Sequence, residues 1–361
     1  MRWTAAVAVW ITGVAWSAAE PIRLATAPER GSVVLQLSAP PTALVQETRE
    51  VALPAGETTL TLSWAGTRLA GETLRLTLGE AAVRVTGPRL PAAQPQQAEW
   101  TLLSPQATET QATFEYVMGG LTWEPEYTLL LDAGAGSGAL SAVAVVRNDS
   151  GEEFEGARID LGLAERATAD LEPGMVLRLP YMAAAGVRCD VTHVFDAAAG
   201  PDTSVRLMLE NTAEANLGQA RLPAGKMRFF EERGGDRLLI GEARLPATPI
   251  GGEAELTLGT AREVAVERRV LRVADVDVRK DVNGRMALWN RDEEVAFLIE
   301  SQKDEAVVLR IVETLDGEWR MLSNSHEFER KDSARIEFTA PIPAHSKVTV
   351  QYKVRRLNLM P

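Results

Sequence analysis

Short runs in which every second residue is apolar recur from one end of the chain to the other. In residues 347–355, Val348, Val350, Tyr352 and Val354 alternate with polar side chains. A period of two places the apolar residues on one face of a β-strand and the polar residues on the other. The same alternation predicts strands at Leu60–Trp64, Leu74–Leu78, Phe114–Tyr116, Tyr127–Leu131, Ile159–Leu163, Val205–Leu209, Val295–Ile299, Val307–Ile311 and Ile336–Phe338.

The spacing of these runs indicates the fold class. They follow one another at roughly 8–14 residues with no convincing helix between them, which is typical of β-sandwiches. The chain is therefore predicted to be all-β, built from tandem antiparallel β-sandwich domains. Only residues 164–201 give a weak signal, because small-residue loops at Ala183–Gly186 and Ala197–Gly200 leave little beyond a strand start at Leu177–Leu179.

Two turns have the sequence of β-hairpins. Arg233-Gly234-Gly235-Asp236 separates the runs 227–231 and 237–240, and Asn283-Gly284 separates 276–282 from 285–289. Glycine supplies the positive φ that tight hairpin turns need, so both are predicted hairpins.

The strand that begins near Val264 changes phase. Val266 and Val270 share one phase, Leu271 and Val273 slip by one residue, and the first phase returns at Val276. Such a slip predicts a β-bulge or a bend in the strand.

Composition divides the chain into five segments. Residues 1–19 have a basic start, an uncharged run and a small-residue end, the pattern of a secretory signal peptide. Residues 20–87 are predicted to form a small N-terminal β-domain. Residues 88–98, with three prolines and three glutamines, are predicted to be a linker. A central β-domain over 99–270 and a C-terminal β-sandwich over 271–361 complete the expected organisation.

Charge and cysteine content restrict the partners and the compartment. The net charge of −12 disfavours nucleic acid, since phosphate binding needs a surplus of Lys and Arg on one face. After residue 19 no run approaches the roughly 20 apolar residues of a transmembrane helix. We expect an extracytoplasmic protein, periplasmic or secreted, with an uncleaved N-terminal anchor as the alternative. Cys189 is the only cysteine, so no intrachain disulfide can form, and the thiol is either buried or bridges two molecules.

Residues suited to catalysis or metal binding are few. The closest grouping is Cys189, Asp190 and His193, which lacks the second Cys/His pair of a structural zinc site. His326-Glu327 starts a zincin-like motif but lacks its second histidine, and no Gly-x-Ser-x-Gly elbow is present. We therefore assign no catalytic, cofactor-binding or metal-binding residue, and we expect no enzyme activity and no cofactor.

Two other patterns have simple structural explanations. Asp275 and Asp277 share a strand face beside Arg272 and Arg279, which indicates a solvated face, since a calcium site needs about six to eight oxygens. Asn148-Asp149-Ser150 is formally a glycan acceptor, but it lies in a turn cluster.

Tryptophans can distinguish two kinds of β-protein. Five follow the predicted signal peptide: Trp64, Trp100, Trp123, Trp289 and Trp319. Tryptophans in a sandwich core indicate a structural role, whereas several on one exposed face would stack on sugar rings. We expect most of them in the core.

Between residues 111 and 355 the chain carries an ordered set of short motifs. They include Trp123-Glu124-Pro125-Glu126-Tyr127, Asn148-Asp149-Ser150-Gly151, Leu222-Pro223-Ala224-Gly225, Val266-Glu267-Arg268-Arg269 and Pro343-Ala344-His345. In this order they resemble the bacterial domain-of-unknown-function family that includes the mucoidy inhibitor A proteins. The resemblance implies an exported or envelope-associated β-rich protein with no assigned chemistry. The coiled coil usual in that family is missing here, and Phe154 stands where the family usually has tryptophan.

These observations give one expected function and two alternatives. We expect an exported, non-catalytic β-sandwich protein of the cell envelope, with a scaffold or protein-interaction role and exposed strand edges that could accept a partner's strand. The alternatives are a polysaccharide-binding module and a hydrolase with an unrecognised site. The partner is thus a protein or an envelope polysaccharide, not nucleic acid.

Overall fold

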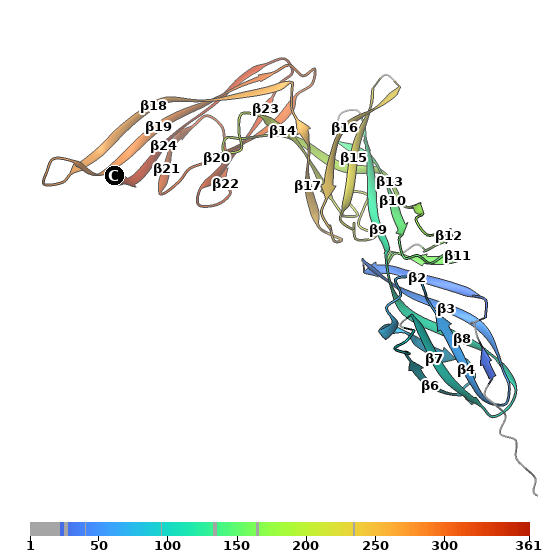
Figure 1. Cartoon of the computed structure of the whole chain (residues 1–361). Coiled ribbons are helices and arrows are strands. Elements are labelled where there is room, and N and C mark those ends of the chain that lie inside the picture. Colours follow the sequence, from blue (N-terminus) through green and yellow to red (C-terminus); the bar gives the residue numbers. More distant parts are fainter. Residues whose placement is uncertain are drawn as a thin grey trace, which may run out of the picture. The chain divides into compact units, whose positions relative to one another are not determined.

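The computed structural model describes residues 22–24, 28–39, 41–94, 96–132, 136–163, 166–233 and 235–361, and the side chains of all of these except 22–24, 38–39 and 233. The predicted signal peptide lies outside the described residues. Within them the protein is all-β, as the alternation predicts, and the one helical element is the 3-10 turn η1 (Gly71–Thr73). The strands form four sheets in two compact units (Figure 1).

The first unit spans residues 1–123 and 146–177. Its two sheets have the strand orders β1-β4-β7-β6 and β12-β11-β2-β3-β8-β5. Most neighbouring strands are antiparallel, but β1 and β4 pair in parallel, as do β2 and β11. The strands are β1 (Ile22–Leu24), β2 (Ser32–Ala39), β3 (Thr42–Leu53), β4 (Gly56–Ser63), β5 (Arg75–Leu78), β6 (Arg84–Arg89), β7 (Gln97–Ser104), β8 (Thr108–Gly119), β11 (Phe154–Asp160) and β12 (Arg166–Leu171).

Aromatic side chains join the two sheets of the first unit. Trp100 of β7 meets Phe114 of β8 edge to face, with ring centroids 5.6 Å apart, and both are fully buried. The indole N–H of Trp123 donates to the carbonyl oxygen of Leu37 at 2.7 Å. Because β7 and β8 belong to different sheets, the contact between Trp100 and Phe114 places the apolar faces of the two sheets against each other, as in a β-sandwich.

The second unit spans residues 124–145 and 178–361. A ten-stranded sheet follows the order β16-β15-β9-β10-β13-β20-β23-β22, with β14 pairing to β13 and β17, and a four-stranded sheet follows β18-β19-β24-β21. The strands are β9 (Leu121–Leu131), β10 (Ser137–Asn148), β13 (Val176–Asp196), β14 (Thr203–Glu210), β15 (Gly225–Arg233), β16 (Asp236–Leu245), β17 (Glu253–Thr260), β18 (Val264–Lys280), β19 (Met286–Ser301), β20 (Val307–Thr314), β21 (Trp319–Asn324), β22 (Phe328–Arg330), β23 (Arg335–Ile342) and β24 (Lys347–Leu359).

Two hydrophobic clusters fill the second unit. The first is built around Tyr127, Met227 and Phe229, and the second around Phe297, whose ring stacks on Tyr352 with centroids 6.1 Å apart. Strand β13 contributes to both clusters, because Val187 and Cys189 belong to the first and Phe195 to the second.

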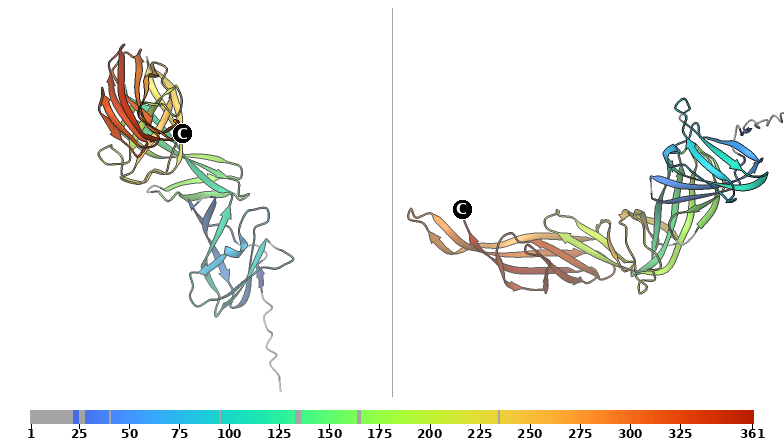
Figure 2. Two further views of the ribbon diagram at one scale, coloured as in Figure 1. Left: turned by 90° about the vertical axis from the view of Figure 1, so that its left-hand side faces the viewer. Right: turned by 90° about the horizontal axis from the view of Figure 1, so that it is seen from below.

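Both predicted hairpins are confirmed. Strands β15 and β16 pair antiparallel with Arg233 opposite Asp236, and β18 and β19 pair antiparallel around a loop that contains Asn283. In this second loop Gly284 has φ +79°, the left-handed conformation that favours glycine. Figures 1 and 2 both show the loop projecting past the ends of the other strands of its sheet.

The phase slip near Leu271 is a β-bulge, as predicted. Val270 lies opposite Val295 and Arg272 opposite Glu294, so Leu271 has no residue opposite it. A second irregularity follows between Val276 and Arg279. Each inserted residue moves the next side chains to the other face of the strand, which explains the slip in the apolar pattern.

The compact units divide the chain elsewhere than the composition indicated. Segment 88–98 was expected to separate two domains, yet the strands that flank it, β6 and β7, pair with each other in one sheet. Strand β7 also pairs with β4 along its whole length, from Ser63 opposite Gln97 to Gly56 opposite Ser104. The boundary expected at residue 271 falls inside β18. Pro and Gln in the first case, and a bulge in the second, mark local interruptions of strands.

Residues 164–201, where the pattern was weakest, contain strands β12 and β13. Strand β13 is 21 residues long and contains Pro180 and the small-residue run Ala183–Gly186. It is held by non-local pairing, since residues 189–195 pair with β14 and residues 193–196 pair in parallel with β20. Tertiary pairing therefore overrides a weak local signal.

Candidate functional site: a buried histidine and an open strand edge

The Cys189–His193 grouping is spread along β13 and cannot act as one site. The two residues are four apart in an extended strand, which separates them by roughly 13 Å. Cys189 is a buried free thiol, and burial, reinforced by Asp190, raises its pKa to about 11. A thiol in this state is a poor nucleophile and a poor metal ligand. Across the described residues no three His, Cys, Asp or Glu side chains are arranged to hold a metal ion.

His193 is a buried polar residue with an unmet hydrogen bond. Its side chain is 5% exposed, and Nδ1 has no hydrogen-bond partner. Burial, together with the positive charge of Lys303, lowers its pKa to about 4, so the imidazole is neutral near pH 7. The ring lines a cavity that Lys303 also lines. Of the other two histidines, His326 is partly buried and contacts Ser325 at 2.9 Å, and His345 is exposed and contacts Asp304 at 3.0 Å.

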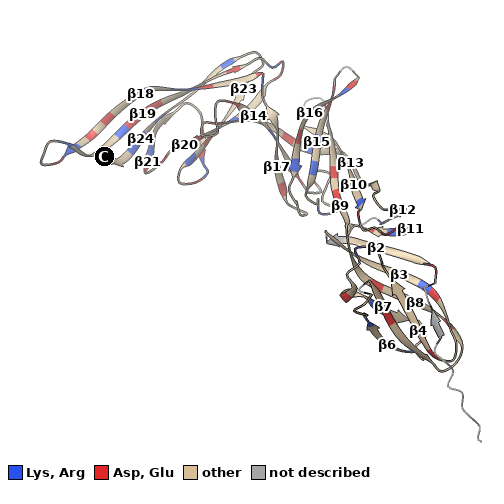
Figure 3. Ribbon diagram, in the orientation of Figure 1, with Lys and Arg blue, Asp and Glu red and all other residues tan. Residues whose placement is uncertain are grey.

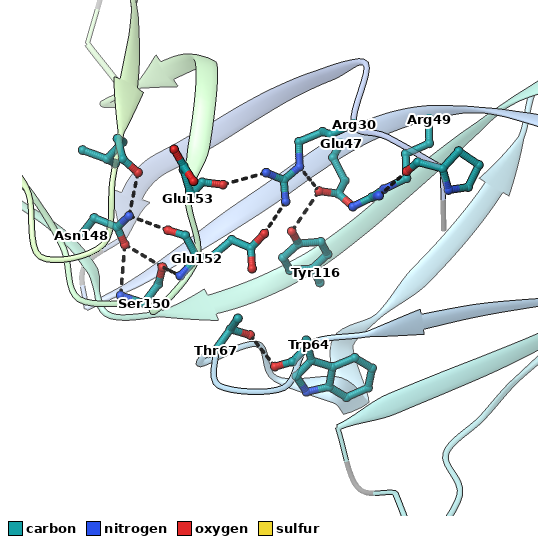
Figure 4. A network of polar contacts seen from close by, with 12 residues as sticks. Arg30, Glu47, Arg49, Trp64, Thr67, Tyr116, Asn148, Ser150, Glu152 and Glu153 are labelled. Atoms are coloured by element: carbon teal, nitrogen blue, oxygen red, sulfur yellow. Dashed lines mark hydrogen bonds and ion pairs between the residues drawn. The ribbon is translucent and has the colours of Figure 1, made fainter. Parts of the chain in front are cut away.

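The first unit contains a buried ionic cluster, which Figure 4 shows from close by. At its centre Glu47 of β3 is 1% exposed, with Arg30 Nε at 2.6 Å and Arg49 Nη2 at 2.9 Å. Tyr116 donates its hydroxyl to the same carboxylate at 3.3 Å. Arg30 also bonds Glu152 at 2.6 Å and donates to the carbonyl oxygen of Glu153 at 2.8 Å.

The electrostatics of this cluster indicate a structural role. Burial disfavours the charge of Arg30, but Glu47 and Glu152 outweigh this effect and raise its pKa. Burial, then the charge of Glu47, raises the pKa of Tyr116. The guanidinium of Arg30 lies over the ring of Phe154, 5.3 Å from its centroid. Each charged group is therefore engaged, and none is left to act on a substrate.

The sequence does contain a signal for this cluster, although no site was predicted there. In β3 the buried phase runs through Val45, Glu47 and Val51. A carboxylate in the apolar phase of a strand predicts a buried ion pair, since an unpaired buried charge is costly. The same holds for Glu313, which follows Leu309 and Ile311 in phase and forms a bidentate pair with Arg268 at 2.8 and 3.1 Å.

The glycan acceptor sequence is occupied in another way. Asn148 is fully buried, and its amide donates to the carbonyl oxygens of Glu152 and Leu171 at 2.7 and 2.9 Å. Its side-chain oxygen accepts from the backbone N–H and the hydroxyl of Ser150. The amide nitrogen that a glycan would need is therefore inaccessible in the folded protein.

The tryptophans are mostly in the core, as expected. Trp64, Trp100 and Trp123 are buried, and Trp289 and Trp319 are partly buried. The ring of Trp319 is covered by the guanidinium of Arg330, 4.5 Å from its centroid. None of these five described side chains is fully open to solvent, so together they form no exposed aromatic face for a sugar.

Strand β18, 17 residues long, forms an open edge of the four-stranded sheet. Along one side β18 pairs with β19, and along the other it has no strand partner in the described chain. Several apolar side chains around and beyond the bulge are exposed: Val270, Leu271 and Val273 are each about half exposed, and Val278 is also exposed. The free N–H and C=O groups of such an edge are a template for another strand.

Charge along the same edge is uneven (Figure 3). Asp275 pairs with Arg291 at 2.7 Å and Asp277 accepts from Asn290 at 2.9 Å, so both carboxylates are engaged with β19, as expected for a charged strand face. The exposed cations Arg272, Arg279 and Lys280 form no ion pair with any described residue. The unsatisfied charge on this edge is therefore positive.

No protein-family model matches the chain, and no curated protein matches it. In the part of the chain that the structure describes, no helix has the length and apolar character needed to cross a membrane.

Proposed function

We propose that this protein is an exported, non-catalytic β-sandwich protein of the cell envelope that binds partner proteins by accepting one of their strands along β18. Export is supported by the basic, apolar and small-residue order of residues 1–19. The interaction role is supported by one observation above all, the long unpaired edge of β18 with its exposed valines.

Two properties of the edge define the partner's chemistry. Exposed Val270, Leu271 and Val273 favour a strand with apolar side chains. The unpaired cations Arg272 and Arg279 favour carboxylates on that strand. The proposed partner is therefore an extended segment in which apolar and acidic residues alternate.

The alternatives have less support. A polysaccharide-binding module needs exposed aromatic rings on one face, and the described tryptophans are buried or partly buried. A hydrolase needs a nucleophile or a carboxylate pair beside a general acid. The most buried carboxylate that we find, Glu47, is fully engaged by two arginines.

Binding of defined peptides tests the interaction role. Short fluorescent peptides with alternating valine and glutamate should bind, and peptides with lysine in place of glutamate should bind more weakly, as measured by fluorescence anisotropy. The variant Val273→Lys should lose binding, because it places a charge on the open edge. The matched control is Val308→Lys, since Val308 is exposed but lies on β20, which is paired on both sides. Equal binding by both variants would refute the role of β18.

Export is tested separately. The full chain is produced in a bacterial host, and the N-terminus of the purified protein is read by mass spectrometry. We expect the mature chain to begin after Ala19. A cytoplasmic protein that retains residues 1–19 would contradict the export proposal without bearing on strand binding.

A further inference from the structure

The cavity beside His193 is a second candidate site, independent of the β18 edge. Its volume is about 370 Å³, within the range of small-molecule sites. It lies in the second unit, where β13, β14, β15, β16 and β17 contribute residues together with the segments between β17 and β18 and between β19 and β20. The lining includes His193, Lys303, Val205, Ile240, Leu258 and Ala261.

The buried polar groups of the cavity are incompletely satisfied. The neutral imidazole of His193 carries one N–H donor and one acceptor, and buried Nδ1 has no partner. Leaving a buried polar atom unpaired is unfavourable, so native structures usually provide a partner. Because Nδ1 is closed to solvent, a ligand in the cavity can reach the ring only through Nε2.

Lys303 gives the cavity its charge. Its side chain is only 25% exposed, and the nearest carboxylate, that of Glu305, lies 3.8 Å from its Nζ and is itself mostly exposed. An ion pair of that length adds little to the stabilisation of a half-buried ammonium. The positive charge is felt at His193, where it lowers the pKa of the imidazole. The cavity therefore presents a cation close to an imidazole.

The remaining charges restrict the kind of anion. Glu231 and Glu263 also line the cavity, opposed by Arg262. Arg262 and Glu263 are exposed, whereas Lys303 and Glu231 are partly buried. The two carboxylates in the lining disfavour a multiply charged anion such as phosphate. The apolar walls of Val205, Ile240 and Leu258 suit a short hydrocarbon body.

We propose that this cavity binds a small monocarboxylate with an apolar body, its carboxylate held by the ammonium of Lys303 and the imidazole of His193. The carboxylate accepts hydrogen bonds from Lys303 Nζ and from the Nε2–H of the His193 ring. The body packs against Val205, Ile240 and Leu258. Such a carboxylate belongs either to a free organic acid or to the C-terminus of a peptide chain.

Histidine NMR resonances test the proposal on the whole protein. The chain has three histidines, and a His193→Gln variant assigns the resonance of His193. Titration with 4-methylpentanoate is expected to shift that resonance saturably at millimolar concentration, and the matching amide is expected to leave it unchanged. A short peptide ending in leucine with a free carboxylate forms a second arm. Tighter binding of the peptide would support the site and identify a chain terminus as the source of the carboxylate.

Variants and a second anion complete the test. Lys303→Met should weaken binding by about tenfold or more, since a charge-assisted hydrogen bond is lost. The matched control Lys347→Met, at an exposed lysine paired with Glu300, should bind like the parent chain. A response to inorganic phosphate stronger than to the acid would overturn the monocarboxylate assignment. Equal shifts with acid and amide, or no shift of the wild-type His193 resonance with any probe, would overturn the site itself.

Discussion

The ionic cluster of the first unit and the histidine cavity of the second place similar polar groups in opposite situations. Glu47 is almost fully buried and is met by Arg30, Arg49 and Tyr116. His193 is almost as buried, yet its Nδ1 meets nothing and its nearest cation, Lys303, has only a long ion pair. Burial alone therefore does not mark a functional group. The adjoining cavity distinguishes the site that can bind a ligand from the cluster that holds the fold.

Removing the centre of the paired cluster should have the largest effect. Glu47→Leu leaves Arg30 and Arg49 charged and largely buried, with side chains 19% and 13% exposed. Breaking a buried pair in this way typically costs about 3–5 kcal/mol of unfolding free energy. Chemical denaturation measures the loss. Glu50→Gln, at an exposed position of the same strand, is the control and should stay within about 0.5 kcal/mol. A loss below about 1 kcal/mol for Glu47→Leu would show that the cluster is not stabilising.

Acidification should lower the stability of the protein through His193, the unpaired group. The pKa of His193 is lowered from its ordinary 6.5 to about 4, so the unfolded chain takes up the proton first as the pH falls. Stability is therefore unaffected by this group above pH 6.5 and is lost between pH 6.5 and 4, by up to about 3 kcal/mol. The charged groups that line the cavity with His193 are those of Lys303, Arg262, Glu231 and Glu263.

The difference between two pH profiles isolates this effect. Unfolding free energies of the wild type and of His193→Gln are measured from pH 7 to 4 by denaturant titration. Other titrating groups contribute to both curves, so the difference between them reports His193. Parallel curves would mean that the imidazole is not kept neutral by the fold.

At neutral pH, substitution by leucine should cost little unfolding free energy at His193 and much more at Glu47. His193→Leu removes a ring whose Nδ1 has no partner, so little hydrogen bonding is lost and the change should stay below about 1 kcal/mol. Glu47→Leu removes a carboxylate that is fully paired with its neighbours. Thermal unfolding of both variants under one condition compares them, and a His193→Leu loss as large as that of Glu47→Leu would refute the distinction.

The smallest effect on stability is expected at the β18 edge. Val273 is about half exposed and packs in neither described cluster. Val273→Lys should therefore change the unfolding free energy by less than about 0.5 kcal/mol, as measured by denaturant titration. A larger loss would place Val273 in the fold and would invalidate the variant as a probe of binding.

Much of the fold follows from local pattern, and most of the sites do not. Alternation identifies the strands around Phe114, Tyr127 and Tyr352, and the slip at Leu271 identifies a bulge, because face and phase are local properties of a strand. The division into units depends on pairing between distant segments, such as β2 with β11. The cavity brings His193 together with Lys303, which lies more than one hundred positions away in the sequence. Local sequence patterns cannot predict that these two residues line one cavity.

The sharing of β13 between the two clusters of the second unit has a mechanical consequence. Its residues from Val187 to Phe195 pass from one cluster into the other without a break. Tension along this strand would act on both clusters at once and would have to shear its pairs with β14 and β20 together. Under an applied force, therefore, the second unit should yield in a single step, with no stage in which one cluster gives way while the other persists.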